Sequence, residues 1–437
     1  MRVLLITYSF PPAAGVGVLR ALSLAKYLPA NGIQVDVLTA RNAAAVGHDP
    51  KLLTQLDPDI YIHRTWALDL PFALRKAIKK AVNRRSANTK AAAPSLPKKI
   101  AKPNPIKALI GNLLLPDPQI GWLPFAFPAA RRIIRSRKID LVLITVPPFS
   151  SATLVTRLRH SFPDLPIVLD FRDEWLTTTI DLVSFNNNAR ARAVAHKAES
   201  EAIRDASAIV CVTHAAVAEV KKRYPSEPSC KFHCIPNGYD TPPPTAKAPT
   251  IPQHSTVLTY IGTVYNSTDP TPVVEAILAL PPDQRERLKL RFIGYIETPA
   301  FRETLLRLGP QVELLGFMPQ AEALRHIQTT TYLLLITHDP INVAAKLFDY
   351  LGSARPILAA VHPTGDVRRI LDDTGAGWSA PVNDPCALGT LFTEAIARTQ
   401  NLAKAYHPDL AKIAAYHRAP LAGQYATLLR SLRKLGA

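Results

Sequence analysis

The feature that most constrains this chain is a regular alternation of short apolar runs with helix-type patterns. In the first half, the runs "RVLLITYS", "IQVDVLTA", "DLVLITV", "PIVLDF" and "AIVCVT" alternate with amphipathic segments such as "GVGVLRALSLAKYL". Strands that alternate with helices predict a parallel sheet with right-handed crossover connections. The first half is therefore expected to form an α/β domain.

The same alternation begins again after a proline-dense stretch, "TPPPTAKAPTIPQHS", which is typical of a linker. A chain of 437 residues is also too long for one ordinary core. We predict a first domain over residues 1–240, a linker over 241–255, a second domain over 256–420 and a C-terminal helix over 421–437. Two Rossmann-like α/β domains of this kind enclose a cleft, and ligands bind beyond the carboxyl ends of the strands.

The net charge of +18 favours anionic partners. Much of it lies in residues 71–115, which contain no acid and fall within a predicted insertion over about 65–115. The segment "LPFALRKAIKKAVNRR" has the pattern of a basic amphipathic helix, so residues 72–110 are expected to contact an anionic membrane surface. A solvated insertion is the alternative. Nucleic-acid binding is disfavoured because Phe72 is the only aromatic residue available for stacking.

The remaining composition argues for a cytoplasmic protein, peripheral at the inner face of the cell membrane. No apolar run approaches the roughly 20 residues of a membrane-spanning helix, and no secretory signal is evident. Four cysteines are too few for a disulfide scaffold. The motif "CKFHC" lacks a second pair of ligands for structural zinc, so no metal site is expected.

The loop "SFPPAAGVGVLR" follows the first predicted strand and contains Gly15 and Gly17. A dinucleotide fingerprint would require a further glycine where Arg20 stands, and an acid at the end of the second strand. A nicotinamide or flavin cofactor is therefore disfavoured. The glycines still permit an anion to approach a helix N-terminus, although a turn that requires only small residues explains them equally simply.

Taken in order, several motifs resemble one family. They are "GWLPFAFPAA", "VPPFSSA", "LDFRDEW", "IPNGYD", "YIGT", "FIGY", "LLGFMP" and "KLFDYLGSARPIL". This set is similar to the family 4-like glycosyltransferases of the GT-B fold, which build bacterial surface polysaccharides. The resemblance implies a UDP- or GDP-linked sugar donor in the second domain, an acceptor in the first, no cofactor, and transfer with retention of configuration. It also implies that the last helix packs back on the first domain.

Carried onto this chain, the resemblance implies donor contacts from Gly262, Thr263, Gly294, Asn342, Lys346, Leu347 and Asp349. Chemically, Lys346 can neutralise phosphate oxygens, and Asp349 can accept hydrogen bonds from ribose hydroxyls. A local ion pair between these two residues, at i and i+3 on a helix, is the alternative. In the family, Asp349 corresponds to the second acid of a Glu-x7-Glu pair, but Ile341 stands where the first acid belongs.

The cluster "DFRDEW" places several charges at a predicted strand end. Carboxylates crowded together raise one another's pKa, as acid–base catalysis requires, so Asp170 and Asp173 join Lys346 as catalytic candidates. A structural brace between Arg172 and Asp173 is the alternative. The predicted acceptor-binding residues are Gly15, Gly17, Arg20 and Arg172.

These features predict transfer of a sugar from a nucleotide-sugar donor to a lipid-linked or oligosaccharide acceptor in surface polysaccharide biosynthesis. Two alternatives stay open: a nucleotide-sugar epimerase of the same fold, and a non-catalytic basic scaffold that binds membranes. The sequence specifies neither the nucleotide, the sugar nor the acceptor, and the substitution at Ile341 leaves retention and inversion both open.

Overall fold

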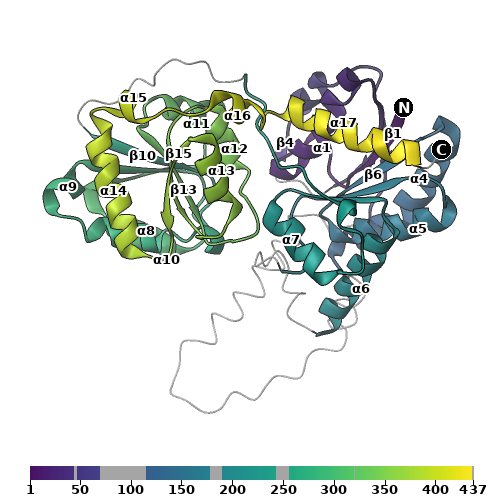
Figure 1. Ribbon diagram of the computed structural model, residues 1–437, viewed down its shortest axis with the longest axis horizontal. Helices are drawn as coiled ribbons and strands as arrows, with labels where there is room; N and C mark the ends of the chain where they lie inside the picture. Colours follow the sequence, from purple (N-terminus) through teal and green to yellow (C-terminus); the bar gives the residue numbers. More distant parts are fainter. Residues whose placement is uncertain (44–46, 69–114, 178–188, 243–254, 319, 436–437) are drawn as a thin grey trace, which may run out of the picture.

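Two parallel β-sheets, each flanked by helices, divide the chain into two domains (Figure 1). The computed structural model describes residues 1–43, 47–68, 115–177, 189–242, 255–318 and 320–435. The predicted membrane segment 72–110 and most of the predicted linker 241–255 lie outside these residues. The predicted fold class, α/β with two Rossmann-like domains, is confirmed.

The first sheet has seven strands in the order β5-β3-β1-β6-β7-β8-β9, and the pairings along it are parallel. Its strands are β1 (Arg2–Ile6), β3 (Gln34–Ala40), β5 (Tyr61–Thr65), β6 (Leu141–Val146), β7 (Ile167–Phe171), β8 (Ala208–Cys211) and β9 (Phe232–Cys234). The α-helices of this domain are α1 (Val16–Tyr27), α4 (Leu123–Arg137), α5 (Thr153–Ser161), α6 (Ala189–Asp205) and α7 (His214–Arg223). A two-residue pairing of β2 (Ala13–Ala14) with β4 (Gly47–His48) ties the first loop to the next connection.

The second sheet has six parallel strands in the order β12-β11-β10-β13-β14-β15. Its strands are β10 (Thr256–Ile261), β11 (Leu288–Ile293), β12 (Val312–Gly316), β13 (Tyr332–Thr337), β14 (Ile357–Val361) and β15 (Gly377–Pro381). Its α-helices are α8 (Thr271–Leu278), α9 (Pro282–Glu286), α10 (Pro299–Leu306), α11 (Gln320–Gln328), α12 (Lys346–Gly352), α13 (Asp366–Thr374), α14 (Pro385–Thr399), α15 (Leu402–Ala405) and α16 (Leu410–Ala414).

Short 3-10 helices complete several connections. They are η1 (Pro29–Asn31), η2 (Pro50–Gln55), η3 (Pro118–Trp122), η4 (Phe149–Ala152), η6 (Ser229–Lys231), η7 (Asn266–Thr268) and η8 (Gly309–Gln311). Four of the seven have proline within their first two positions, where its fixed φ and missing N–H cost nothing.

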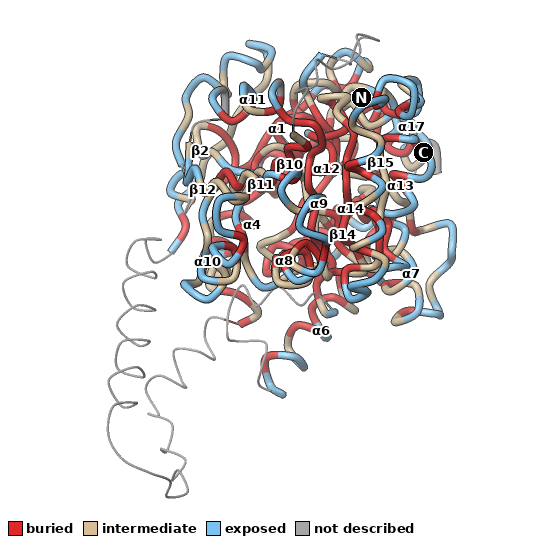
Figure 2. Tube along the Cα trace, turned by 90° about the vertical axis from the view of Figure 1, so that its left-hand side faces the viewer, coloured by how far each residue is buried: buried red, intermediate tan, exposed pale blue. Residues whose placement is uncertain are grey.

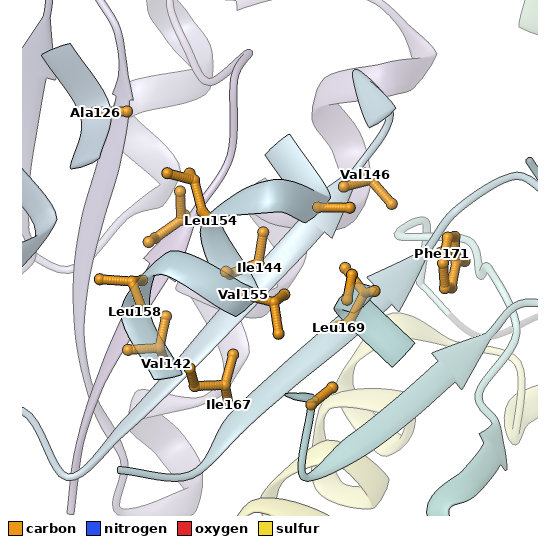
Figure 3. Close-up of a cluster of buried hydrophobic side chains, with 14 of the residues drawn as sticks. Ala126, Val142, Ile144, Val146, Leu154, Val155, Leu158, Ile167, Leu169 and Phe171 are labelled. Atoms are coloured by element: carbon orange, nitrogen blue, oxygen red, sulfur yellow. The ribbon is translucent and has the colours of Figure 1, made fainter. Parts of the chain in front are cut away.

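The central strands read as continuous apolar runs because helices cover both faces of each sheet. Along β6, Val142, Ile144 and Val146 pack with α5 on one face (Figure 3). Leu141 and Leu143 pack in the cluster on the other face. Buried residues accordingly follow the strands, and exposed ones follow the outer turns of the helices (Figure 2). The sheets therefore hold their carboxyl ends rigidly in place.

The last helix, α17 (Arg418–Leu435), crosses back to the first domain and lies along α1 (Figure 1). Leu421, Tyr425, Ala426 and Leu429 are buried in the same cluster as the first strands. The chain thus crosses between the domains twice, once after β9 and once before α17.

Candidate functional site

The strand order reverses at one point in each sheet, between β1 and β6 in the first and between β10 and β13 in the second. At such a point the connections leave in opposite directions and open a crevice outside the carboxyl ends of the strands. The loops after β10 and β13 contain Gly262 and the segment 338–345. The loop after β1 contains Gly15.

A cavity of about 210 Å³ lies where the two domains meet. Its walls come from the start of α1, the loop after β7, the crossover at Pro236–Gly238, Ala345 before α12, and α17. Both domains and the returning helix therefore contribute to a single recess, as a two-substrate site requires.

The structure brings Gly262 and Lys346 together at the switch point of the second sheet. The Lys346 Nζ donates a hydrogen bond to the Tyr260 hydroxyl at 2.5 Å and lies 3.7 Å from the centre of that ring. A Cβ at Gly262 would lie 2.9 Å from the Lys346 Nζ, and its φ of 129° is one that glycine adopts readily. The backbone of Gly262 therefore approaches the ammonium group as closely as it can.

Burial lowers the pKa of Lys346 to about 7. Among the described residues, no carboxylate forms an ion pair with it, so the predicted alternative of a local Lys346–Asp349 pair is wrong. Burial disfavours the charged form of a lysine that lacks a carboxylate partner. An anion bound beside the lysine stabilises the ammonium form, so such a site favours anion binding.

Gly294 directly follows the neighbouring strand β11 and lies against the same loop. A Cβ there would lie 2.3 Å from the carbonyl oxygen of Gly262, a distance that no side chain tolerates. Thr263 is exposed, and its carbonyl accepts a hydrogen bond from the Tyr260 hydroxyl at 2.8 Å. These predicted donor residues therefore lie around one backbone turn beside Lys346.

Asp349 follows Lys346 by almost one turn of α12, and part of its side chain reaches solvent. Burial raises its pKa to about 6, and the positive charge of Arg418 opposes this shift. Arg418 begins α17 and donates from Nε to the Gly238 carbonyl at 3.0 Å. A carboxylate with spare acceptor capacity is thus held close to the cavity wall that Arg418 forms.

Leu347 does not fit its predicted role as a donor contact. Its side chain is fully buried in the core of the second domain, and its backbone N–H donates to the Ala344 carbonyl. Helical periodicity explains the outcome, because consecutive residues on an α-helix point about 100° apart, so Leu347 faces the core when Lys346 faces the loop of Gly262. The part of Leu347 that a ligand could touch is therefore small.

Asn342 and Ile341 join the domains. The Asn342 Oδ1 accepts a hydrogen bond from the Glu174 backbone N–H at 3.1 Å, and Thr213 Oγ1 donates to the Ile341 carbonyl at 2.7 Å. The Ile341 side chain packs against the core of the first domain. The predicted donor contact of Asn342 thus competes with an interdomain one, and Ile341 has an apolar environment in which an acid would be poorly solvated.

Asp173 lines the cavity, and Asp339 of the second domain lies close enough to repel the ionised form of the Asp173 carboxyl. Burial raises the pKa of Asp173; Arg172 opposes the shift and Asp339 adds to it. No hydrogen bond to the Asp173 carboxylate is found among the described residues. Asp173 is therefore the acid of the "DFRDEW" cluster that remains available to a ligand.

Asp170 is fully buried and already has partners. Arg20 donates to it from Nη2 at 2.8 Å and from Nε at 3.0 Å, and the Tyr425 hydroxyl donates at 2.6 Å. Burial opposes ionisation, but the adjacent guanidinium outweighs it and lowers the pKa of Asp170. This geometry is that of a structural ion pair, and it leaves the predicted catalytic role of Asp170 and the acceptor role of Arg20 without geometric support.

The remaining predicted acceptor residues lie at the N-terminal side of the cavity. Gly15 precedes α1 with open space around it, and a Cβ at Gly17 would lie 3.3 Å from the Arg172 Nη1. Arg172 donates from Nη2 to the Pro147 carbonyl at 2.6 Å. Arg172 therefore lies beside the glycine loop and does not form the predicted brace with Asp173 among the described ion pairs.

The sequence interpretation missed Tyr260, Arg418 and Tyr425. Tyr260 reads as an ordinary strand residue, and the other two belong to a helix that is far from the site in sequence. An exposed stacked pair, Tyr295 and Phe317, was also missed; its ring centres are 4.9 Å apart, directly beyond β11 and β12. Exposed aromatic residues directly after strand glycines were the available signal.

Within the described residues, no group of three or more His, Cys, Asp or Glu is placed to hold a metal ion. The four cysteines are unpaired. No helix in the described part of the chain is long and apolar enough to cross a membrane.

Comparisons with known proteins agree with this arrangement. Residues 83–242 match the model of Glycosyltransferase Family 4. A probable glycosyltransferase, WbjE of Pseudomonas aeruginosa, is 39% identical over 54 residues, which cover 12% of this chain and 14% of that protein. The chain therefore matches only a small part of the length of this curated relative.

Solved structures match over nearly the whole chain. Anabaena HepE in complex with UDP superposes with a TM-score of 0.62 at 14% identity, covering 99% of this chain and 100% of HepE. Sucrose-phosphate synthase of Thermosynechococcus elongatus gives a TM-score of 0.62 at 14% identity, covering 99% and 98%. The predicted resemblance to family 4-like glycosyltransferases of the GT-B fold is confirmed, and the match to the Glycosyltransferase Family 4 model lies over residues 83–242.

Proposed function

We propose that the protein transfers a sugar from a UDP- or GDP-linked donor to a lipid-linked or oligosaccharide acceptor in surface polysaccharide biosynthesis. The observation that carries this proposal is the placement of Lys346 beside Gly262 at the switch point of the second sheet. HepE, which has the same fold, was solved with UDP and with UDP-glucose.

In this proposal, Lys346 and the Gly262 backbone bind the diphosphate of the donor. As the bond to the sugar breaks, negative charge grows on the departing diphosphate, and a preorganised cation stabilises that charge. Asp349 accepts hydrogen bonds from the ribose hydroxyls. The stacked pair Tyr295 and Phe317 offers a flat surface to the base of the nucleotide. Aromatic rings stack on every nucleobase, whichever base it is.

The acceptor approaches from the first domain, where Asp173 lines the cavity. Burial raises the pKa of the Asp173 carboxyl, which favours exchange of a proton with an acceptor hydroxyl. The hydrogen bonds from Glu174 to Asn342 and from Thr213 to Ile341 hold the domains together, which limits access of water to the donor. Retention of configuration is the outcome that the family resemblance favours.

Nucleotide binding is tested by thermal unfolding of the parent and of Asp349→Asn with UDP, GDP and ADP. A ligand at one hundred times its Kd stabilises the folded state by about 2.7 kcal/mol. We expect one nucleotide to raise the Tm of the parent, and Asp349→Asn to lose this shift while its ligand-free Tm does not fall. Glu303→Gln, an exposed acid on α10, is the matched control and should keep the full shift.

Two results would contradict the proposal: no nucleotide stabilises the parent, or Asp349→Asn keeps the parent's shift. Transfer itself is followed by mass spectrometry with the nucleotide sugar that binds, because an epimerase would change the donor without lengthening any acceptor. The anomeric coupling of the product, measured by NMR, decides between retention and inversion.

The cytoplasmic location at the inner face of the membrane, through residues 72–110, belongs to the same proposal. Its support is the sequence, with no acid and eleven bases between residues 70 and 114. Deletion of residues 72–110 is expected to abolish binding to anionic liposomes and to leave nucleotide binding unchanged.

A further inference from the structure

Two arginines lie together at the carboxyl edge of the first sheet, away from the donor residues. Strands β3 and β5 are parallel neighbours, with Thr39 opposite Arg64. Arg41 directly follows β3, and its backbone N–H donates to the Thr65 carbonyl at 2.7 Å. The Arg64 Nη2 donates to the Pro11 carbonyl at 2.5 Å, which places its guanidinium against the loop that leads into α1.

No carboxylate forms an ion pair with either guanidinium within the described residues. Burial lowers the pKa of Arg64, and the positive charge of Arg41 lowers it further, so the two cations are close enough to repel each other. Like charges held together without an acid are unfavourable in the free protein, and an anion placed between them removes that cost.

An exposed apolar surface adjoins this pair. Trp66 is 56% exposed with the Arg41 guanidinium 5.4 Å from its ring centre, and Leu68 is 70% exposed. This segment is fixed by hydrogen bonds: Asn42 exchanges two with the Ala67 backbone, each 2.9 Å, and the Leu68 N–H donates to the Gly121 carbonyl at 3.1 Å. The backbone is therefore tied down while both large apolar side chains face outward.

The charge of the chain itself limits what can cover this surface. Asp69 follows Leu68, and residues 70–114 beyond it contain eleven bases and no acid, so this stretch adds net positive charge and does not neutralise the arginines. The surface requires a ligand that is anionic at one end and apolar along the rest. It also lies at the carboxyl edge of the acceptor-side sheet, next to the loop that forms one side of the cavity.

We propose that Arg41 and Arg64 bind the phosphate or diphosphate of an acceptor carried on an aliphatic, isoprenoid-type chain, and that Trp66 and Leu68 contact the start of that chain. The proposal rests on the proposed function, because it assigns the class of acceptor. Two adjacent guanidiniums match two adjacent phosphates, and hydrogen bonds between oppositely charged groups are stronger than neutral ones.

The test measures binding of farnesyl diphosphate by calorimetry, without membranes, to the parent, to Arg41→Ala/Arg64→Ala and to Trp66→Ala. We expect the double variant to bind about tenfold or more weakly, and Trp66→Ala to lose affinity for farnesyl diphosphate but not for inorganic diphosphate. Arg132→Ala/Arg135→Ala on α4 removes the same charge from an exposed surface and should bind as the parent does. Because Arg64 is half-buried, the exposed single variant Arg41→Glu provides a second test that does not disturb the fold.

Three results would overturn the proposal. Both double variants could weaken binding equally, which indicates general electrostatic attraction. Inorganic diphosphate could bind as tightly as farnesyl diphosphate, which indicates a simple anion site. Vesicles of phosphatidylglycerol could be the only ligand lost in Arg41→Glu, which indicates a membrane contact. UDP binding, measured on the same samples, is expected to be unchanged, and its absence in the parent would refute the proposed function instead.

Discussion

The unusual environment of Lys346 predicts that nucleotide binding takes up a proton. Burial places its pKa at about 7 in the free protein, against an ordinary value of 10.5. At pH 8, about one Lys346 in ten is therefore charged. A bound diphosphate favours the ammonium form and restores a pKa well above 8, so each binding event should take up about 0.9 proton at this pH.

The same reasoning sets the pH dependence of affinity. Above pH 7, every further pH unit leaves one tenth as much charged Lys346 in the free protein, which costs about 1.4 kcal/mol and weakens binding about tenfold. This trend continues until the pKa of the bound state is reached. Asp349, with a pKa of about 6, is already ionised at pH 8, as is a terminal phosphate with a second pKa of about 6, so neither contributes.

Proton uptake is measured by calorimetry at pH 8 in two buffers with different ionisation enthalpies. Lys346→Arg keeps a permanent charge and should bind without proton uptake, because an arginine does not titrate here. A parent that takes up no proton at pH 8, and whose Kd is constant from pH 7 to pH 9, would refute the reasoning.

The stability of the ligand-free protein provides an independent check of the direction of the Lys346 pKa shift. The folded pKa of Lys346 lies below the unfolded value, so the unfolded chain binds more protons between pH 7 and pH 10.5. The contribution of this group to stability therefore rises with pH across that window. A nucleotide-saturated protein should not show this rise.

Two further substitutions test the framework of the site. Tyr425→Phe removes a hydroxyl that is bonded to the buried pair Asp170 and Arg20, and is expected to lower the free energy of unfolding by about 1–3 kcal/mol in urea titrations, with nucleotide binding intact. Gly262→Ala places a methyl group 2.9 Å from the Lys346 Nζ at a φ that alanine avoids, so calorimetry should show nucleotide affinity falling at least tenfold.

Matched controls separate these effects from general ones. Tyr61→Phe removes the hydroxyl of an exposed tyrosine and should leave the free energy of unfolding unchanged. Gly389→Ala adds a methyl group in open space within α14 and should stabilise the protein slightly. Equal stability of Tyr425→Phe and Tyr61→Phe would show that the buried hydroxyl is not needed.

The family resemblance implied both Gly262, directly after β10, and Lys346, at the start of the helix that follows β13. A strand run that ends in glycine, and another run followed by a helix that begins with lysine, belong to neighbouring strands of one parallel sheet. Such a sheet aligns its carboxyl ends, so residues that are distant in sequence meet at one edge. The strand order that places β10 beside β13 came from the structure, and it is what brings these two residues together.

The "DFRDEW" cluster shows where this reasoning stops. Asp170 and Asp173 look equivalent in sequence, yet Asp170 is fully buried against Arg20, whereas Asp173 lines the cavity. Alternation along β7 directs Asp170 to the face of the sheet that α1 and α17 cover, and Asp173 lies in the loop beyond the strand. A buried carboxylate is tolerated only with a partner, and that partner comes from a different helix.

The sequence by itself determined the two α/β domains and the edges at which their ligands lie, because hydrophobic periodicity and strand–helix alternation are local properties. The lysine and the glycine turn of the donor side were implied by the family resemblance. Only the tertiary structure decided which polar groups of the site already have hydrogen-bond partners within the protein. Asn342 and Ile341 bond to the first domain, and Tyr425 reaches Asp170 across 255 positions of sequence. The physical reason is that burial and partnership depend on what the folded chain brings alongside a side chain, which no local pattern records.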